Sequence, residues 1–201
     1  MKKVPFRKAF LLASAFTFTL GFTSCKNESK PEDPKEVAEE ENKEVVEGVK
    51  DEAKAVEDNS KKFVEIAEFD LKQRELAKLA EAKATSKEVK DLAVTIENSH
   101  NASIKELSEL AKSKQISIPE ALTDSGKKEY DALNKKSGQD FDVEYIDQTI
   151  KAHRDAIRDF SNYASQTQDL EFKSWLEKKV ASLQSHFDAI NAMIAKSNSR
   201  K

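Results

Sequence analysis

The feature that most limits the fold of this chain is a helical spacing of apolar residues that recurs from residue 61 onward. Apolar residues return every three or four positions, as they do on the buried face of an amphipathic helix, and no alternating strand pattern competes with them. The 201-residue chain holds only four glycines and four prolines, so long helices can run without interruption. The sequence therefore predicts an all-α domain over residues 61–201.

Four long helices account for this pattern. They are expected at about residues 61–84, 85–114, 140–165 and 169–194. Thr85 stands three residues before Glu88, which is the spacing of a capping box, and Asp169 can cap the last helix. The short links between the first two and the last two helices predict two antiparallel hairpins, and so a four-helix bundle.

The connection over residues 115–139 decides how the hairpins are arranged. It contains Gly126 and Gly138, and a short helix fits residues 127–134. If the connection crosses the length of the bundle, the arrangement is ferritin-like, and if it returns at one end, it is not.

The first 24 residues have the three parts of a secretory signal peptide. Four basic residues open the chain, an apolar run follows from Ala9 to Phe22, and small residues precede Cys25, the single cysteine. The apolar run is too short to cross a bilayer comfortably, since a spanning helix needs about 20 residues. We therefore predict a signal peptide over residues 1–24.

The residues around Cys25 resemble a bacterial lipoprotein signal, in which the cysteine is acylated and becomes the first mature residue. The resemblance departs at Phe22, where the usual pattern has Leu. It implies lipidation of Cys25 and, because Lys26 rather than Asp follows, transfer to the outer membrane. The alternative is a free thiol in an ordinary secreted protein. We expect a lipid-anchored protein of the cell envelope, since several acyl chains anchor stably.

Residues 26–60 are strongly acidic, with six basic and thirteen acidic side chains, few apolar residues and no aromatic ones. Such a composition resists packing into a core, so residues 25–60 are predicted to be a lipidated cysteine and a charged tether. Four apolar residues in it do have helical spacing and would suit a docked helix instead: Val45, Val49, Ala53 and Val56. Residues 61–201 carry twenty-four charges of each sign, so nucleic acid is not an expected partner.

The three histidines of the chain lie at core positions, each near the middle of a different predicted helix. They are His100, His153 and His186. At a rise of about 1.5 Å per residue, they come out at similar heights whichever way the connection runs. Imidazole nitrogens suit Zn, Fe, Cu or Ni, so convergent histidines predict a transition-metal site. The alternative is a buried network of polar side chains that fixes the register of the helices.

Two glutamates are candidates to join the histidines. Glu75 lies on the apolar face of the first helix, four residues from Leu71 and from Leu79. Glu97 lies three residues before His100, and such Glu-x-x-His pairs supply ligands in ferritin-like metal proteins. Only one such pair is present, which speaks against a di-iron oxidase, and no Ser–His–Asp arrangement stands out. An enzyme is therefore the weaker expectation.

Several stretches, taken in order, resemble the bacterial domain-of-unknown-function family 4142. They are RELAKLAEAKATSKEVKDLA, IENSH, FDVEYIDQTIKAH and LQSH. The resemblance implies a ferritin-like fold, an outer-membrane or periplasmic address, and a recurring set of positions: Glu75, His100, Asp142, Tyr145, His153 and His186. It departs at Ser99, where the family has Asp, and it brings no established reaction.

Two functions stay open at this point. One is a binding or structural module of the envelope, anchored to the membrane and acting on a protein partner that the sequence does not name. The other is a metal-binding protein, with a redox or metal-handling role, that uses the core histidines.

Overall fold

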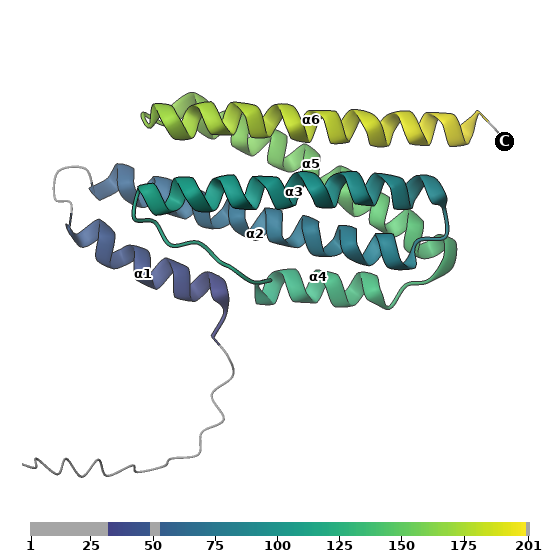
Figure 1. Cartoon of the computed structure of the whole chain (residues 1–201), viewed down its shortest axis with the longest axis horizontal. Helices are drawn as coiled ribbons and strands as arrows, with labels where there is room; N and C mark the ends of the chain where they lie inside the picture. Colours follow the sequence, from purple (N-terminus) through teal and green to yellow (C-terminus); the bar gives the residue numbers. More distant parts are fainter. Residues whose placement is uncertain (1–31, 49–52, 200–201) are drawn as a thin grey trace, which may run out of the picture. The chain divides into compact units, whose positions relative to one another are not determined.

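The computed structural model describes residues 32–48 and 53–199, and every regular element in these two ranges is an α-helix (Figure 1). The helices are α1 (Pro34–Gly48), α2 (Ala53–Lys83), α3 (Lys87–Ser113), α4 (Asp124–Asn134), α5 (Gly138–Gln166) and α6 (Leu170–Asn198). The prediction of an all-α chain is confirmed. The predicted signal peptide, residues 1–24, and Cys25 lie outside the described residues.

In the described part of the chain, no helix is both long enough and apolar enough to cross a bilayer.

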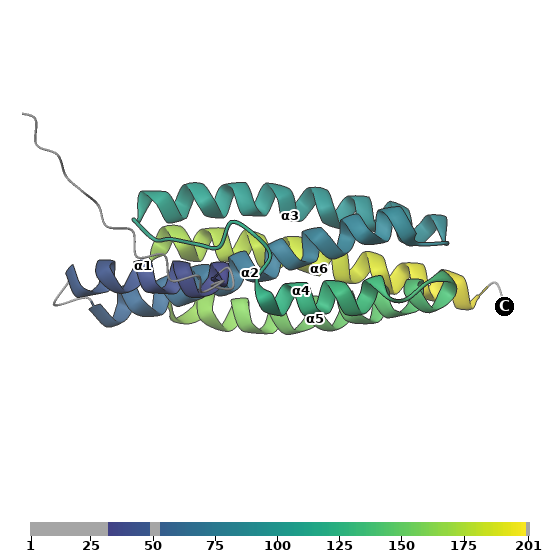
Figure 2. The ribbon, with the colours of Figure 1, turned by 90° about the horizontal axis from the view of Figure 1, so that it is seen from below.

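Two long antiparallel hairpins, α2–α3 and α5–α6, form the helical bundle (Figure 2). They meet through contacts of α3 with α6 and of α2 with α5. The connection between the hairpins contains α4 and runs back along the bundle, so α3 and α5 begin at the same end (Figure 1). The predicted cap on the last helix is confirmed, because Asp169 Oδ1 accepts from the N–H of Phe172 at 3.0 Å.

The interior is divided into two apolar clusters with a layer of buried polar side chains between them. The first apolar cluster lies toward the α2–α3 link and includes Leu76, Ile96, Phe141 and Ile190. The second apolar cluster lies toward the α5–α6 link and includes Phe63, Leu107, Phe172 and Leu183. We call the buried polar set between them the polar layer: Asp70, His100, Ser103, His153, Lys179 and His186.

The acidic segment, predicted to be a charged tether with a docked helix as the alternative, is helical where the structure describes it. Residues 34–48 form α1, and α2 begins at Ala53 rather than near residue 61. α1 packs against α2 and buries Ala38 and Asn42. Asn42 Nδ2 donates to the carbonyl oxygen of Ser117 at 2.9 Å, and Asn42 Oδ1 accepts from the N–H of Ser117 at 2.8 Å. The hydrogen bonds between Asn42 and Ser117 thus dock α1, a helix with few apolar residues, on the bundle.

The start of α3 is capped differently from the prediction. Ser86, not Thr85, is the N-cap residue, and its hydroxyl oxygen accepts from the N–H of Val89 at 3.3 Å. Thr85 donates its N–H and its hydroxyl to the carboxylate of Asp142 on α5, at 2.9 and 2.6 Å. The N–H of Ser86 donates to the same carboxylate at 2.8 Å. Asp142 therefore satisfies free backbone donors at this helix end from a neighbouring helix.

Candidate functional site

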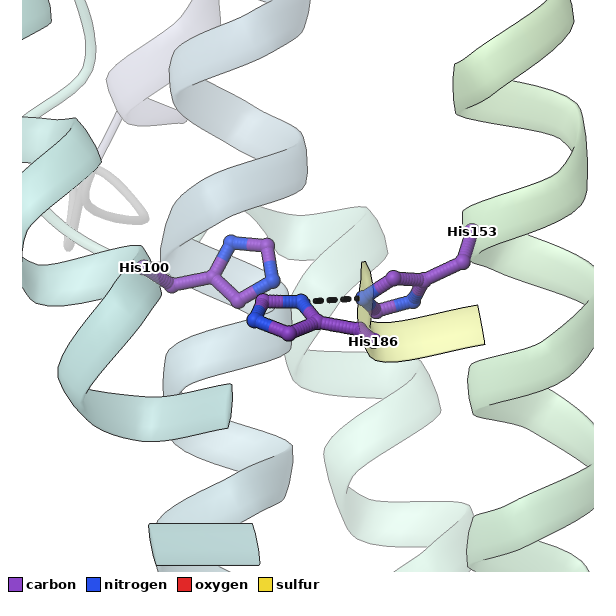
Figure 3. Close-up of side chains that lie close together, drawn as sticks. All are labelled: His100, His153 and His186. Atoms are coloured by element: carbon purple, nitrogen blue, oxygen red, sulfur yellow. Dashed lines mark hydrogen bonds between the residues drawn. The ribbon is translucent and has the colours of Figure 1, made fainter. Parts of the chain in front are cut away.

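The three histidines converge in the polar layer from three different helices: His100 from α3, His153 from α5 and His186 from α6 (Figure 3). Each offers one ring nitrogen, and these three atoms lie within 4.8 Å of one another. The ring centroids form a nearly equilateral triangle with sides of 5.6, 5.7 and 5.3 Å. His100 and His153 are 0% exposed and His186 is 6% exposed, so the cluster is almost fully shielded from solvent.

His100 is oriented by a buried carboxylate on α2. Its Nδ1 lies 2.7 Å from Asp70 Oδ1 and must donate, because the carboxylate can only accept. Asp70 also accepts from Lys179 Nζ at 2.5 Å and from the hydroxyl of Ser103 at 2.6 Å. With its Nδ1 protonated, His100 carries a lone pair on Nε2. That atom is buried and has no hydrogen-bond partner in the described structure.

His153 is oriented by the backbone of its own helix. Its Nδ1–H donates to the carbonyl oxygen of Thr149 at 2.9 Å, which leaves a lone pair on Nε2. His186 Nδ1 lies 3.1 Å from this Nε2 and donates to it, as the dashed line in Figure 3 marks. His153 and His100 thus share one arrangement: a proton fixed on Nδ1 and a lone pair on Nε2 inside the cluster. Metal-binding histidines have the same outer hydrogen bonds to carboxylates or carbonyl groups.

The centroid distances are close to those of a site for one metal ion, whereas the three ring nitrogens, now within 4.8 Å of one another, would have to lie within about 4.1 Å to share it. An ion about 2.05 Å from each nitrogen, in a trigonal arrangement, would hold the imidazole centroids about 5.5 Å apart. The 3.1 Å between His153 Nε2 and His186 Nδ1 would give a nitrogen–metal–nitrogen angle of about 98° at that bond length. His186 would have to move its proton from Nδ1 to Nε2, its more exposed side, before Nδ1 could bind.

Burial keeps the three imidazoles neutral near pH 7. It lowers the pKa of His100 to about 4, with the charge of Lys179 acting in the same direction against the raising effect of Asp70. Burial and the neighbouring His100 and Lys179 lower the pKa of His186 to about 4. Burial, with His100 and His186, holds the pKa of His153 well below its usual value. Neutral imidazole is the form that binds metals, so no histidine of the cluster has to give up a positive charge before an ion binds.

Asp70 is ionised in the same layer. Burial raises the pKa of its carboxyl group, but Lys179 and the hydrogen bond from His100 outweigh that effect and set it at about 2. The ring of Phe69, the preceding residue, makes edge contacts with His100 and His153 at centroid distances of 5.4 and 5.9 Å. The polar layer is therefore closed on the α2 side by an aromatic ring and an ion pair.

The glutamates proposed from the sequence do not join the histidines. Glu75 Oε1 accepts from Arg74 Nε at 2.8 Å and from Lys78 Nζ at 3.2 Å, on a different face of α2. Glu97 is half-buried and accepts from Asn101 Nδ2 at 3.4 Å. Among the described residues, the group that could hold an ion contains the three histidines alone.

Two other predicted site positions lie on α5 toward the start of α3. Asp142 caps α3, as described above, and lies about 16 Å along the helix axis from His153 at 1.5 Å per residue. Tyr145 is 1% exposed within the first apolar cluster, and burial raises the pKa of its phenol. Both residues support the fold at that end of the bundle rather than the histidine cluster.

Sequence reasoning missed Asp70 and Lys179, although each left a signal. Lys179 lies three residues after Leu176 and four before Leu183, which places it on the buried stripe of α6. Asp70 lies three residues after Ala67 and seven before Ala77, both fully buried. A charged residue at a core position seven residues from a histidine, as Lys179 is from His186, is the pattern that points to Lys179.

These features define a class of protein: an all-helical bundle with a buried cluster of three histidines at its centre. A family model, Domain of unknown function (DUF4142), matches residues 46–193. The chain belongs to this family, and the resemblance seen in the sequence is confirmed. The match begins at the end of α1 and continues into α6. No curated protein and no solved structure matches the chain.

Proposed function

We propose that this protein binds a transition-metal ion through His100, His153 and His186. The observation that carries the proposal is His100 Nε2, a buried lone pair with no hydrogen-bond partner in the described structure, which faces two other imidazoles (Figure 3). A buried polar atom left unpaired costs about 1–3 kcal/mol, and an ion shared with His153 and His186 would remove that cost. Three imidazoles suit Zn, Cu, Fe or Ni.

The proposal also covers the fold of the bundle and the cellular location of the protein. The connection that runs back along the bundle supports a four-helix bundle of the ferritin-like kind, with α1 and α4 packed outside it. The basic, apolar and small-residue pattern before Cys25 supports a lipid anchor on the cell envelope, at the outer membrane. The protein is then a metal-handling or redox module that faces the periplasm or the cell surface.

The metal proposal is tested by elemental analysis of the full protein, purified without an affinity tag or chelator. We expect about one equivalent of metal in the wild type, and its loss in His186→Ala and His153→Ala. Glu75→Gln is the matched control and should keep the metal, because Glu75 pairs with Arg74 and Lys78 instead. No metal in the wild type, together with no rise in melting temperature on adding Zn²⁺, Cu⁺, Fe²⁺ or Ni²⁺, would exclude the proposal.

The second candidate is a polar network with a structural role. Asp70 favours it, because one carboxylate accepts from His100 and Ser103 on α3 and from Lys179 on α6, which ties three helices together. This reading predicts that loss of His186 changes stability but no metal content. Thermal melts of the metal-free wild type and His186→Ala, beside the elemental analysis, separate the two functions.

The anchor has a test of its own. Cys25→Ser should abolish acylation and move the protein from the membrane fraction to the soluble fraction. A protein that stays with membranes after this change would contradict lipid anchoring through Cys25.

A further inference from the structure

The charge of the polar layer bears on which ion it can hold. Asp70 is the single carboxylate that contacts the histidine cluster in the described structure, and its Oδ1 lies 2.5 Å from Lys179 Nζ. The side chains of Asp70 and Lys179 are 0% and 3% exposed, so water does not screen either charge. The pair is neutral, and the three imidazoles add no charge. An ion entering the cluster therefore meets no negative charge that is free to balance it.

A divalent ion would be poorly stabilised by such a neutral site. Bound by three imidazoles alone, it would leave two uncompensated positive charges in a buried layer, and buried unpaired charges are costly. Asp70 does not compensate this charge, because Lys179 Nζ lies 3.4 Å from His100 Nδ1 and offsets the attraction of Asp70 Oδ1 at 2.7 Å. A singly charged ion has about a quarter of the burial cost, because that cost grows with the square of the charge.

This inference rests on the proposed function: we propose that the absence of net charge beside the histidines, where Lys179 neutralises the buried Asp70 carboxylate, makes this site selective for Cu⁺ over divalent ions. Copper is among the metals that imidazole suits, and Cu⁺ accepts three nitrogen donors without a fourth ligand. Among the described residues, the group holds three histidine donors and no cysteine or carboxylate as a fourth. A divalent ion would have to bring an anion such as hydroxide, and its solvent-facing position would be on the His186 side.

The proposal is tested with a series of four proteins that differ in the charge of the pair. Wild type and the double variant Asp70→Asn with Lys179→Met are neutral, Lys179→Met alone carries one negative charge, and Asp70→Asn alone carries one positive charge. The affinities for Cu⁺, kept reduced in the absence of oxygen, and for Zn²⁺ are measured by competition with indicator ligands. The double variant is the matched control, because it loses both side chains without changing the net charge.

Wild type is expected to prefer Cu⁺. A unit charge about 7 Å from the ion, at an effective dielectric constant of about 20, changes affinity about 50-fold per charge on the ion. The ratio of Zn²⁺ affinity to Cu⁺ affinity should therefore rise about 50-fold in Lys179→Met and fall about as much in Asp70→Asn. In the double variant it should stay within a few-fold of wild type.

The outcomes separate this inference from the proposed function. If wild type binds neither ion and the elemental analysis finds no metal, the metal proposal itself is wrong, whereas another metal in that analysis would overturn the Cu⁺ inference alone. If wild type binds metal but prefers Zn²⁺, or if the ratio is the same in all four proteins, the site binds metal and the charge-selectivity inference is overturned. Should a single variant fail to fold, the competition on wild type and on the double variant still decides whether Cu⁺ is preferred.

Discussion

The polar layer and the two apolar clusters beside it are equally buried, but they are held together in different ways. Leu107 and Leu183 in the second apolar cluster are 0% exposed and are stabilised by burial alone, which needs no particular partner. Asp70 and His100 are also 0% exposed, yet each depends on named partners at fixed distances. The comparison teaches that the two apolar clusters stabilise the bundle, whereas the polar layer lowers that stability in order to hold donors and charges in a fixed arrangement.

Acid should produce the largest difference between the two regions. His100 and His186 have folded pKa values of about 4, below the usual 6.5, so the unfolded chain takes up protons first as the pH falls. Stability is therefore full above about pH 6.5 and declines toward pH 4, by about 3 kcal/mol for each of these histidines if they titrate independently. Urea unfolding of the metal-free protein in EDTA, repeated across this range, measures the loss.

The matched control for the acid effect is His186→Ala, in which the decline between pH 6.5 and 4 should be shallower. A wild-type stability that stays flat over this range would show that the histidines are not buried as neutral imidazoles. Loss of the Asp70 contribution belongs to lower pH, between about 4 and 2, because its folded pKa of about 2 lies below the usual 3.8.

The next largest effect should come from Asp70→Ala. It leaves the Lys179 ammonium buried without a counter-charge and removes the acceptor of His100 and Ser103. Breaking a buried ion pair from one side costs about 3–5 kcal/mol. The free energy of unfolding, taken from urea titration at pH 7, checks this, and a loss below 1 kcal/mol would contradict the pairing. The double variant Asp70→Asn with Lys179→Met should recover much of the loss.

Leu107→Ala tests an apolar end in the same way. Leu107 is 0% exposed in the second apolar cluster, and removing three buried carbon atoms leaves a cavity, so we expect a loss of about 3 kcal/mol. Unlike the changes in the polar layer, this loss should be the same at pH 5 and pH 7. A loss that depends on pH would mean that the apolar cluster and the polar layer are coupled.

Ser103→Ala should have the smallest effect of these changes. It removes one of the donors to Asp70 Oδ2, a hydrogen bond of 2.6 Å to a charged group, and should cost about 2 kcal/mol. Urea titration of this variant, with Ser108→Ala on the more exposed part of α3 as the control, measures it. An equal change in both variants would show that Asp70 does not depend on this hydroxyl.

The sequence predicted the helices and the histidine cluster because both depend on spacing alone. His100, His153 and His186 lie on the apolar stripes of their own helices, and any packing of those stripes brings them inside. Asp70 could not be found in this way, because α2 contacts α1, α3, α4 and α5 and buries residues on several faces. The periodicity of apolar residues therefore allows more than one inward face for α2. The sequence prediction placed the face with Glu75 inside, whereas the structure buries the face with Asp70.

Two further features also depend on a partner from elsewhere in the chain. α1 is buried through the hydrogen bonds between Asn42 and Ser117, and no local pattern reveals a contact across so many residues. Thr85 has the spacing of a capping box, but Asp142 from α5 takes its donors and leaves Ser86 as the cap. Propensity and spacing describe what a segment can do alone, and tertiary contacts select among those options.

The spread of the polar layer over four helices also orders its assembly while the chain is being made. α2 and α3 leave the ribosome before α5 and α6, and they carry Asp70 with its His100 and Ser103 partners. His153 follows on α5, and both Lys179 and His186 arrive on the last helix. Until α6 docks, the Asp70 carboxylate has no ammonium beside it and the cluster lacks its third ring. An unfinished chain therefore presents a different centre from the completed one, and the last helix to be synthesised is the one that closes it.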